Sequence, residues 1–511
     1  MMWSRVLLLF VALQLSCAPS AYEALLAHQL SPDKPFCEGA EEPPPSRLQE
    51  VWARFTEPLA QGLNGIHVLD DGAGALSARG WLSDNATTSI DIQYFIFSAD
   101  NVGLIAVERL LAAAERGVQV RLLVDDLLVD GDSLLLLALN AHPNVAIRIY
   151  NPSINIGKNM AGKLTSMAAN FRRVNQRMHN KTFIVDKRVA ITGGRNVADE
   201  YFDFNREFLF RDRDVLVFGP EVVQVSSSFD AFWTSDLSWP LELVLEKPDD
   251  FDPPLVWDKL HRYACDPARF VPAFRERIER VPETWAVLSR EGHLVWSDKV
   301  RFVSDLPGKN MQKRSLKGGG ASTDAMIHLL EGAKESILIQ SPYVVLTKLG
   351  LGLLRSAIER GVKVHILTNS LASTDNYPAF SGYKRVRKKL LKLGVELFEF
   401  RPDADLRRTL VTAPVLADAS MGLHAKSMVV DEQRVVIGTF NMDPRSANLN
   451  TECVVIIDSN KLGKRLAKQM RYEMRAENAW QVSLVENPDS KAGFWKSFQV
   501  MWSRLIPRSL L

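Results

Sequence analysis

Apolar and polar positions follow the same order twice along this chain. Ser89–Phe97 (SIDIQYFIF) and Ser336–Val344 (SILIQSPYV) are short runs rich in apolar and β-branched residues, which indicate strands. After each run, apolar residues recur at helical spacing, from Leu104 to Arg116 and from Leu349 to Arg360. The pattern therefore predicts a strand followed by a helix in each half.

The two halves also share the segment that ends this helix. Ala113–Asp126 (AAERGVQVRLLVDD) and Ala357–Ser370 (AIERGVKVHILTNS) each contain a helix end, a glycine turn and a second strand. The order strand, helix, strand predicts α/β units with parallel strands. The chain has 511 residues, too many for one hydrophobic core, so a duplicated α/β unit is expected.

The strongest internal match is between MHNKTFIVDKRVAITGGRN and LHAKSMVVDEQRVVIGTFN, which begin at Met178 and Leu423. Both read as a strand, a turn and a second strand. Polar and glycine positions coincide when the two are aligned on their histidines. The equivalent pairs are His179 and His424, Lys181 and Lys426, Asp186 and Asp431, Gly193 and Gly438, and Asn196 and Asn441.

Strand geometry separates these residues by role. Residues two apart on a strand share a face, so His179 and Lys181 point to the same side. Asp186 lies seven residues beyond His179, a span of about 23 Å, and the odd offset turns it to the other face. Asp186 and its counterpart Asp431 are therefore expected to be structural, holding a strand end or a neighbouring turn.

A turn after each aspartate would bring the next strand back beside the histidine. Gly193 and Gly438 would permit close backbone approach there, and Asn196 and Asn441 would add amide donors. A histidine, a lysine and an asparagine from each half suit a tetrahedral phosphate. One imidazole can attack phosphorus while the other moves the proton, and no metal or cofactor motif is present or needed.

A carboxylate is expected to orient each imidazole. In the second half Glu452 is the candidate, because NTECVVII reads as a strand that opens with an acid. In the first half FRDRDVLVFGP offers Asp212 and Asp214, and Asp212 is favoured.

Composition is that of an ordinary globular protein, with 46% apolar and 24% charged residues. The formal net charge of +2 does not support a nucleic-acid footprint. No CxxC pair occurs among the four cysteines. Cys453 is expected to be a small buried apolar residue, and a Cys37–Cys265 disulfide is possible if the protein is exported.

The N-terminus has the form of a secretory signal, with Arg5, an apolar run too short to span a bilayer, and small residues. LQLSC resembles an imperfect lipobox that would place a lipid on Cys17, with Gln14 where an aliphatic residue is usual. Cleavage after Ala18 is the alternative. No later stretch is apolar for long enough to predict a transmembrane helix.

The motifs HNKTFIVD…GGRN and HAKSMVVD…GTFNMDPRSANLNTE resemble the paired HKD motifs of the phospholipase D superfamily, over about residues 47–475. GVKVHILTNSLASTDNYPAFSGYKRVRKKLLKLGVELFEF is most similar to the bacterial cardiolipin synthases of the C branch. The resemblance implies two similar α/β/α sandwich lobes, related by a pseudo-twofold axis, that share one active site. It also implies transfer of a phosphatidyl group through a phosphohistidine.

Carried onto this chain, the resemblance makes His179 the nucleophile and His424 the acid and base. The phosphate would be held by Lys181, Lys426, Asn196 and Asn441. The expected organisation is a signal-like segment (1–18), a first lobe (47–237), a connecting region (238–317), a second lobe (318–475) and a tail (476–511).

The tail contains an amphipathic segment from Phe494, with apolar residues on one face of a helix. It suits an interfacial membrane anchor, and the alternative is a helix packed on the protein's own core. The basic segment 151–177 is a candidate border of the lipid entrance.

The leading functional hypothesis is cardiolipin synthesis from phosphatidylglycerol and a second phospholipid, such as phosphatidylethanolamine, at a membrane surface. Localisation would be the bacterial cell envelope, with the protein exported and membrane-associated. Hydrolysis of phospholipids to phosphatidic acid is the first alternative, since water competes with alcohols for the same intermediate. A phosphodiesterase nuclease and a non-enzymatic lipid-binding protein are the others, although no nucleic-acid partner is expected.

Overall fold

A computed structural model describes residues 25, 47–126, 133–152, 175–269, 294–311, 317–411, 416, 418–507 and 510–511. The signal-like segment with Cys17, the residue Cys37, and most of the basic segment 151–177 lie outside the described residues. Within the part described, no helix is long and apolar enough to cross a membrane.

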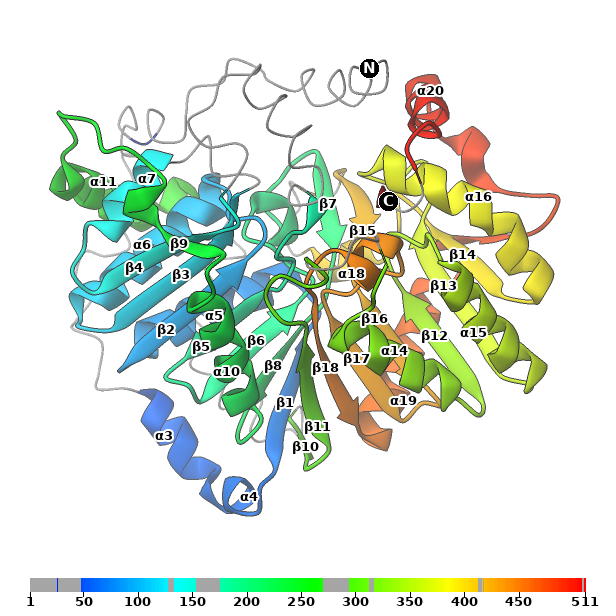
Figure 1. Ribbon diagram of the computed structural model, residues 1–511, viewed down its shortest axis with the longest axis horizontal. Helices are drawn as coiled ribbons and strands as arrows, with labels where there is room; N and C mark the ends of the chain where they lie inside the picture. The colour runs from blue at the N-terminus through cyan, green and yellow to red at the C-terminus, as the bar shows by residue number, and fades with distance from the viewer. Residues whose placement is uncertain are drawn as a thin grey trace.

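Two large mixed sheets form the centres of two lobes (Figure 1). In spatial order, the first has β10 (Val295–Ser297), β1 (Asn64–Leu69), β8 (Asp214–Phe218), β6 (Val189–Gly193), β5 (Thr182–Val185), β2 (Ser89–Tyr94), β3 (Gln119–Asp125), β4 (Val145–Tyr150) and β9 (Ser238–Pro240). The second has β11 (Val300–Ser304), β18 (Cys453–Asp458), β17 (Arg434–Gly438), β16 (Ser427–Val430), β12 (Ser336–Gln340), β13 (Lys363–Asn369), β14 (Glu396–Phe400) and β19 (Ala479–Val482). From β1 and β11 onward the two orders correspond strand by strand, which confirms the duplicated α/β fold.

Helices cover the sheets. Those of the first lobe are α3 (Arg47–Arg54), α4 (Thr56–Ala60), α5 (Gly72–Asn85), α6 (Asn101–Glu115), α7 (Ser133–Asn140), α10 (Val222–Trp233) and α11 (Pro253–Cys265). Those of the second lobe are α14 (Ala321–Glu331), α15 (Lys348–Glu359), α16 (Tyr377–Leu393), α17 (Arg407–Leu410), α18 (Pro444–Asn448), α19 (Asn460–Glu473) and α20 (Phe494–Ser503).

The predicted strand–helix–strand unit is present in both lobes as β2–α6–β3 and β12–α15–β13, with parallel pairing of the two strands. Asp100 caps α6 by accepting a hydrogen bond from the Gly103 amide, and Thr347 caps α15 in the same way. After each helix the chain turns at Gly117 (φ +94°) and Gly361 (φ +89°), a left-handed conformation that glycine adopts without strain.

The paired motifs form the hairpins β5–β6 and β16–β17, as the sequence predicted. Both turns have positive φ at two central residues, Asp186 and Lys187 in the first and Asp431 and Glu432 in the second. This is the twist that matches a tight hairpin.

Both sheets draw strands from outside the ranges expected for the lobes. In the connecting region, β10 pairs antiparallel with β1, and β11 pairs antiparallel with β18. In the tail, β19 pairs with β14. The second sheet thus extends past 318–475 at both ends, because its edge strands are too short to stand out in the hydrophobic pattern.

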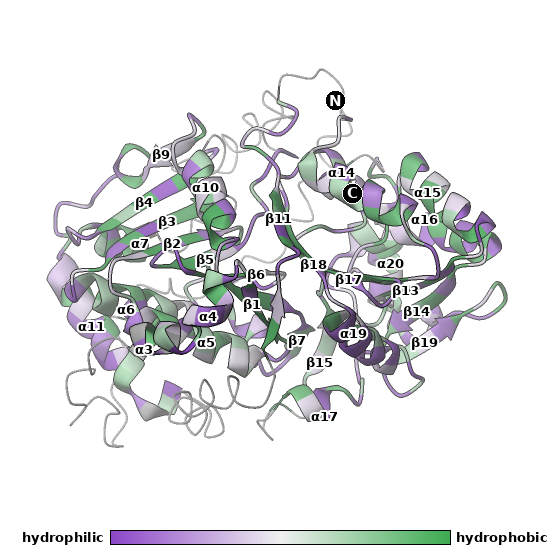
Figure 2. Ribbon diagram, turned by 90° about the horizontal axis from the view of Figure 1, so that it is seen from below, coloured by the Kyte–Doolittle hydropathy of each residue, from purple (hydrophilic) through white to green (hydrophobic). Residues whose placement is uncertain are grey.

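The lobes share a hydrophobic core that contains residues of both sheets, such as Ile184 and Val217 of the first lobe and Val429 and Val455 of the second. Helices α10 and α19 contribute to it. A short parallel ladder between β7 (Phe208–Arg211) and β15 (Ser420–Leu423) joins the lobes next to the motifs. Figure 2 shows mostly hydrophobic strands through the middle of the molecule and a mostly hydrophilic helix α19.

Cys265, at the end of α11, is disulfide-bonded, and Cys453 is a buried free thiol. Because Cys37 lies outside the described residues, the Cys37–Cys265 pairing stays a prediction.

Candidate active site

His179, just before β5, is buried against Glu452, just before β18 of the other lobe. The His179 Nδ1 lies 2.8 Å from Glu452 Oε2, and the Ser446 hydroxyl donates to Glu452 Oε1 at 2.6 Å. With Nδ1–H donating to the carboxylate, the second ring nitrogen, Nε2, keeps a lone pair for chemistry.

His424, just before β16, has the equivalent arrangement with Asp212 of the first lobe. Its Nδ1 lies 2.6 Å from Asp212 Oδ2, and the Arg213 amide donates to Asp212 Oδ1 at 2.7 Å. Both carboxylates are completely buried. Burial raises the pKa of both acids, but electrostatic attraction and the hydrogen bond to His424 hold the Asp212 pKa below its usual range, and those to His179 do the same for Glu452.

The acids are therefore exchanged between the lobes. Sequence reasoning placed Glu452 with the second half and Asp212 with the first, but each contacts the histidine of the opposite half. Backbone pairing across the interface causes the exchange. The His179 amide donates to Thr451 O at 3.0 Å, and the His424 amide donates to Arg211 O at 2.8 Å. The residue after Thr451 is Glu452 and the residue after Arg211 is Asp212, so each acid lies next to the histidine of the other lobe.

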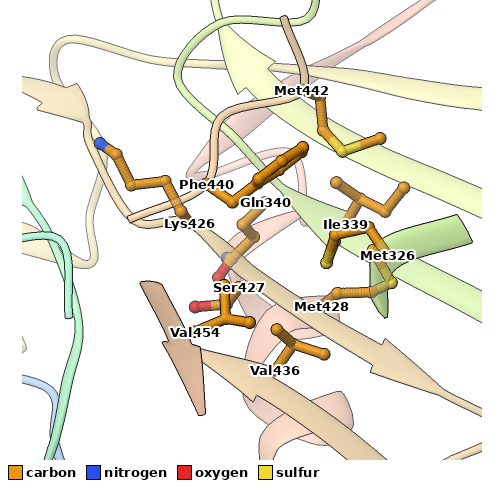
Figure 3. A pocket seen from close by; sticks show the side chains of 10 residues that line it. All are labelled: Met326, Ile339, Gln340, Lys426, Ser427, Met428, Val436, Phe440, Met442 and Val454. Atoms are coloured by element: carbon orange, nitrogen blue, oxygen red, sulfur yellow. The ribbon is translucent and has the colours of Figure 1, made fainter. Parts of the chain in front are cut away.

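Lys181 and Lys426 are buried beside their histidines and donate to the backbone carbonyls of His179 (2.9 Å) and His424 (2.6 Å). Burial and mutual repulsion lower the pKa of Lys181 to about 7, and burial lowers that of Lys426 to about 8. Figure 3 shows the Lys426 ammonium turned away from apolar side chains, such as Met428, that line a small cavity along its stem. Burial disfavours the charged forms of both lysines, and a bound anion would favour them again.

Burial also dominates the histidines. It lowers the pKa of His179 to about 4 and that of His424 to about 3, although Glu452 and Asp212 act in the opposite direction. Both imidazoles are therefore neutral at pH 7. A neutral imidazole is a nucleophile, whereas proton donation requires a bound anion to raise the pKa again.

Glycines permit close backbone approach, as the sequence predicted for Gly193 and Gly438. A Cβ on Gly193 would lie 2.5 Å from Asp214 Cα, and one on Gly438 would lie 2.7 Å from Val454 Cα. A Cβ on Gly194 would lie 2.7 Å from the carboxylate carbon of Asp212. The GG and G positions of the motifs therefore bring each return strand into close contact with the strand that follows the acid.

The two asparagines differ. Asn196 donates to the Tyr201 hydroxyl at 2.9 Å and accepts from the Ile96 amide at 3.2 Å, so its side chain is already engaged. The amide oxygen of Asn441 is buried and has no hydrogen-bond partner among the described residues. Of the two predicted amide donors, the one on Asn196 therefore already donates within the first lobe.

Asp186 and Asp431 lie at the far ends of their strands. Asp186 accepts hydrogen bonds from the amides of Thr87, Thr88 and Ser89 at the start of β2. Asp431 accepts from the amides of 334–336 at the start of β12. Each fixes the hairpin turn to the neighbouring strand.

Asp214, the alternative to Asp212, is bound to Arg79 (2.9 Å) and Arg195 and does not reach a histidine. Sequence reasoning also missed an aromatic lining. Ring centroids of Phe95 lie 5.1 Å from His179, and those of Tyr201 and Phe210 lie 5.1 and 4.8 Å from His424. The run YFIF after β2 was the available signal for Phe95. Within the described ranges, no group of three or more His, Cys, Asp or Glu residues could hold a metal ion.

A family model described as "Cardiolipin synthase, PLD-like domain" matches residues 82–233 and again 326–474. The chain belongs to this PLD-like family. Each copy of the PLD-like domain contains one histidine motif and the acid that contacts the histidine of the other copy.

Several relatives of this PLD-like chain are known. Cardiolipin synthase C of Escherichia coli K12 is 34% identical over 471 residues, covering 87% of this chain and 96% of that protein. A cardiolipin synthase of Staphylococcus aureus Mu50 is 24% identical, covering 83% and 69%. The crystal structure of a phosphatidylserine synthase from Haemophilus influenzae Rd KW20 has a TM-score of 0.58 at 14% identity, covering 90% and 99%, and shares the fold.

Proposed function

We propose that the protein is a phosphatidyltransferase that makes cardiolipin from phosphatidylglycerol and a second phospholipid. The observation that carries this is the pair of buried histidines, each on a buried carboxylate of the opposite lobe and beside a buried lysine. The similarity to cardiolipin synthase C over most of both chains supports the choice of lipid substrates.

In the first step, the His179 Nε2 lone pair forms a bond to the phosphorus of the donor lipid. The bond from phosphorus to the headgroup oxygen breaks, and His424 Nε2–H gives its proton to that oxygen. Lys181 and Lys426 stabilise the equatorial oxygens, and their charge suits the extra negative charge of the transition state. Because the phosphate anion raises the pKa of the neighbouring imidazole, substrate binding itself supplies the protonated His424.

In the second step, a hydroxyl of phosphatidylglycerol attacks the phosphatidyl-histidine. His424 takes the hydroxyl proton, the P–N bond breaks, and cardiolipin leaves. Glu452 and Asp212 hold the Nδ1 protons throughout, so each imidazole presents Nε2 to the substrate.

We also propose an exported protein of the bacterial cell envelope. The signal-like N-terminus motivates this, and the disulfide at Cys265 fits an oxidising compartment. Detection of the mature N-terminus by mass spectrometry would test both the signal and lipidation of Cys17. An unprocessed chain in the cytoplasmic fraction would contradict the proposal.

Purified full-length protein and phosphatidylglycerol vesicles, with and without phosphatidylethanolamine, test the activity. Mass spectrometry should detect cardiolipin, together with free glycerol or ethanolamine, and the released alcohol identifies the donor. Phosphatidic acid as the sole product would indicate a phospholipase D. Cleaved plasmid DNA without any lipid product would exclude a lipid enzyme.

The roles of the histidines have a separate test. A His424→Asn variant lacks the acid of the first step and the base of the second, so phosphatidyl groups should form slowly on His179 and persist there. Peptide mapping under alkaline conditions, which preserve phosphohistidine, locates the modification. A covalent adduct on His424 in a His179→Asn variant would reverse the assignment.

A further inference from the structure

Helix α20 carries a stripe of large apolar side chains that face solvent. The exposed fractions are 74% for Phe494, 72% for Trp495, 39% for Phe498, 54% for Met501, 45% for Trp502 and 46% for Leu505, just past the helix end. Their spacing places all six on one side of the helix. Single exposed apolar residues are ordinary, but six that are contiguous on one helix mark an interaction surface.

The opposite face of α20 fixes the helix to the second lobe. Val500 and Ser503 are buried, and the Ser503 carbonyl accepts a hydrogen bond from the Ser381 hydroxyl of α16 at 3.3 Å. The Arg385 guanidinium, also on α16, donates to the Arg504 carbonyl. Figure 1 shows α20 at the top of the second lobe, beside α16. The helix therefore packs on the core and still presents an apolar surface.

Helix α20 contacts the loop after β13, and β13 ends at Asn369, which is hydrogen-bonded to Leu423, the residue before His424. The Lys496 ammonium of α20 donates to the Ala372 carbonyl in the loop after β13. In the same loop, the Asp375 carboxylate accepts a hydrogen bond from the Tyr343 hydroxyl at 2.7 Å. The loop after β13 therefore contacts α20 at one point and the surroundings of the site at another.

We propose that the outward face of α20 docks on a lipid bilayer and holds the active site at the level of the phospholipid headgroups. The identity of the partner follows from the chemistry of the stripe. Tryptophan and phenylalanine are the residues that favour the bilayer interface. The segment 493–511 contains Lys496, Arg504 and Arg508 and no acidic residue, which complements an anionic lipid surface. The inference rests on the proposed function, which requires a lipid substrate.

Flotation with phosphatidylglycerol vesicles tests the docking. The test variant Trp495→Ser/Phe498→Ser/Trp502→Ser removes three large side chains from the stripe. The control variant Val223→Ser/Leu243→Ser/Leu255→Ser removes three exposed apolar side chains of the first lobe, far from α20 in sequence. All proteins carry Cys17→Ser, so that a lipid anchor cannot mask the effect. The vesicle partition coefficient should fall at least about tenfold for the test variant and remain unchanged for the control.

A second readout separates docking from catalysis. Activity on phosphatidylglycerol vesicles should fall in parallel with binding, whereas activity on monomeric short-chain phosphatidylglycerol should stay within about twofold of the parent protein. The single variant Phe494→Asp provides the same comparison if the triple variant does not fold. Vesicle binding at the parent level in a folded α20 variant would overturn the proposal. A change of oligomeric state with unchanged vesicle binding would instead assign the stripe to a second copy of the chain. Vesicle binding that depends on α20 without any cardiolipin product would contradict the proposed function and leave the docking surface established.

Discussion

Replacing Glu452 by glutamine probes the exchange of carboxylates between the lobes. Both oxygens of Glu452 are used, Oε2 by His179 Nδ1 at 2.8 Å and Oε1 by the Ser446 hydroxyl at 2.6 Å. Glutamine has the same size and can still accept from Ser446. Its NH₂ group then faces Nδ1 and can only donate a hydrogen bond to it. Nδ1 must therefore be the unprotonated nitrogen, and the imidazole proton lies on Nε2. The nucleophilic lone pair of His179 is lost in this tautomer.

The size of the effect follows from that loss. Loss of the carboxylate that fixes the tautomer of a catalytic imidazole lowers kcat by up to about 10⁴-fold in the Ser-His-Asp triad, and we expect kcat of Glu452→Gln to fall by about 10²- to 10⁴-fold. At about 1.4 kcal/mol per tenfold, the barrier rises by about 3–5 kcal/mol. KM should change little, because Lys181 and Lys426, the proposed phosphate ligands, are unchanged.

Transfer kinetics on vesicles and ¹⁵N spectra of the histidine rings measure the two consequences. Glu452→Gln should shift the ring signals of His179 alone, and Asp212→Asn those of His424 alone. Glu396→Gln is the matched control, since Glu396 lies 3.3 Å from His365 outside the site and its loss should leave transfer unchanged. If Glu452→Gln shifts His424 and spares His179, or keeps full activity, the exchanged arrangement is refuted.

Other predictions concern charge and stability. Because the pKa values of Lys181 and Lys426 are lowered to about 7 and 8, both lysines lose charge as pH rises, and KM for lipid should increase above about pH 7–8. Lys426→Met removes a cation that repels the Lys181 charge, so it should raise the pKa of Lys181. The same depressed pKa values mean that the unfolded chain binds more protons, so stability should increase with pH from about 7 toward 10. Asp186→Ala should lower the free energy of unfolding in urea by about 2–3 kcal/mol, with kcat unchanged, since three strand amides lose their acceptor. Glu473→Gln should cost about 3 kcal/mol, because it removes the buried carboxylate that pairs with Arg211 (2.7 Å) and Arg213 (3.2 Å) across the interface.

Each of these has an outcome that would contradict it. A flat KM profile from pH 6 to 9 would mean that the lysines do not titrate in the site. A large loss of kcat in a stably folded Asp186→Ala protein would give the acid a catalytic role. Unchanged stability of Glu473→Gln would show that Asp70, which also binds Arg211 at 3.0 Å and Arg213 at 2.7 Å, suffices to compensate the arginines.

Local patterns explain why much of the fold was predictable. The strand–helix–strand units and the two hairpins follow from spacing within fewer than about 40 residues, and the repeat supports each prediction by a second copy. The edge strands β10 and β11 have only three and five residues, and their partners lie far away in sequence, so they were assigned to a connection.

The site was predictable only as far as its motifs. His179, Lys181 and their counterparts were found because they recur in register. The partner of each histidine depends on how the two lobes face one another, and no local spacing encodes that. The same applies to Tyr201, whose hydroxyl accepts a hydrogen bond from Asn196 and whose ring packs against His424. This residue lies in η3 (Asp199–Tyr201), which reaches the second lobe only after folding.

The exchange of acids between the lobes also determines what a damaged molecule can do. If the lobes separate, by proteolysis between them or by partial unfolding, His179 loses Glu452 and His424 loses Asp212 in the same event. Neither fragment then holds an oriented imidazole with its counterpart. By the proposed mechanism, a broken protein of this kind should be inactive as a whole and should leave no half-assembled site that could hydrolyse the lipids around it.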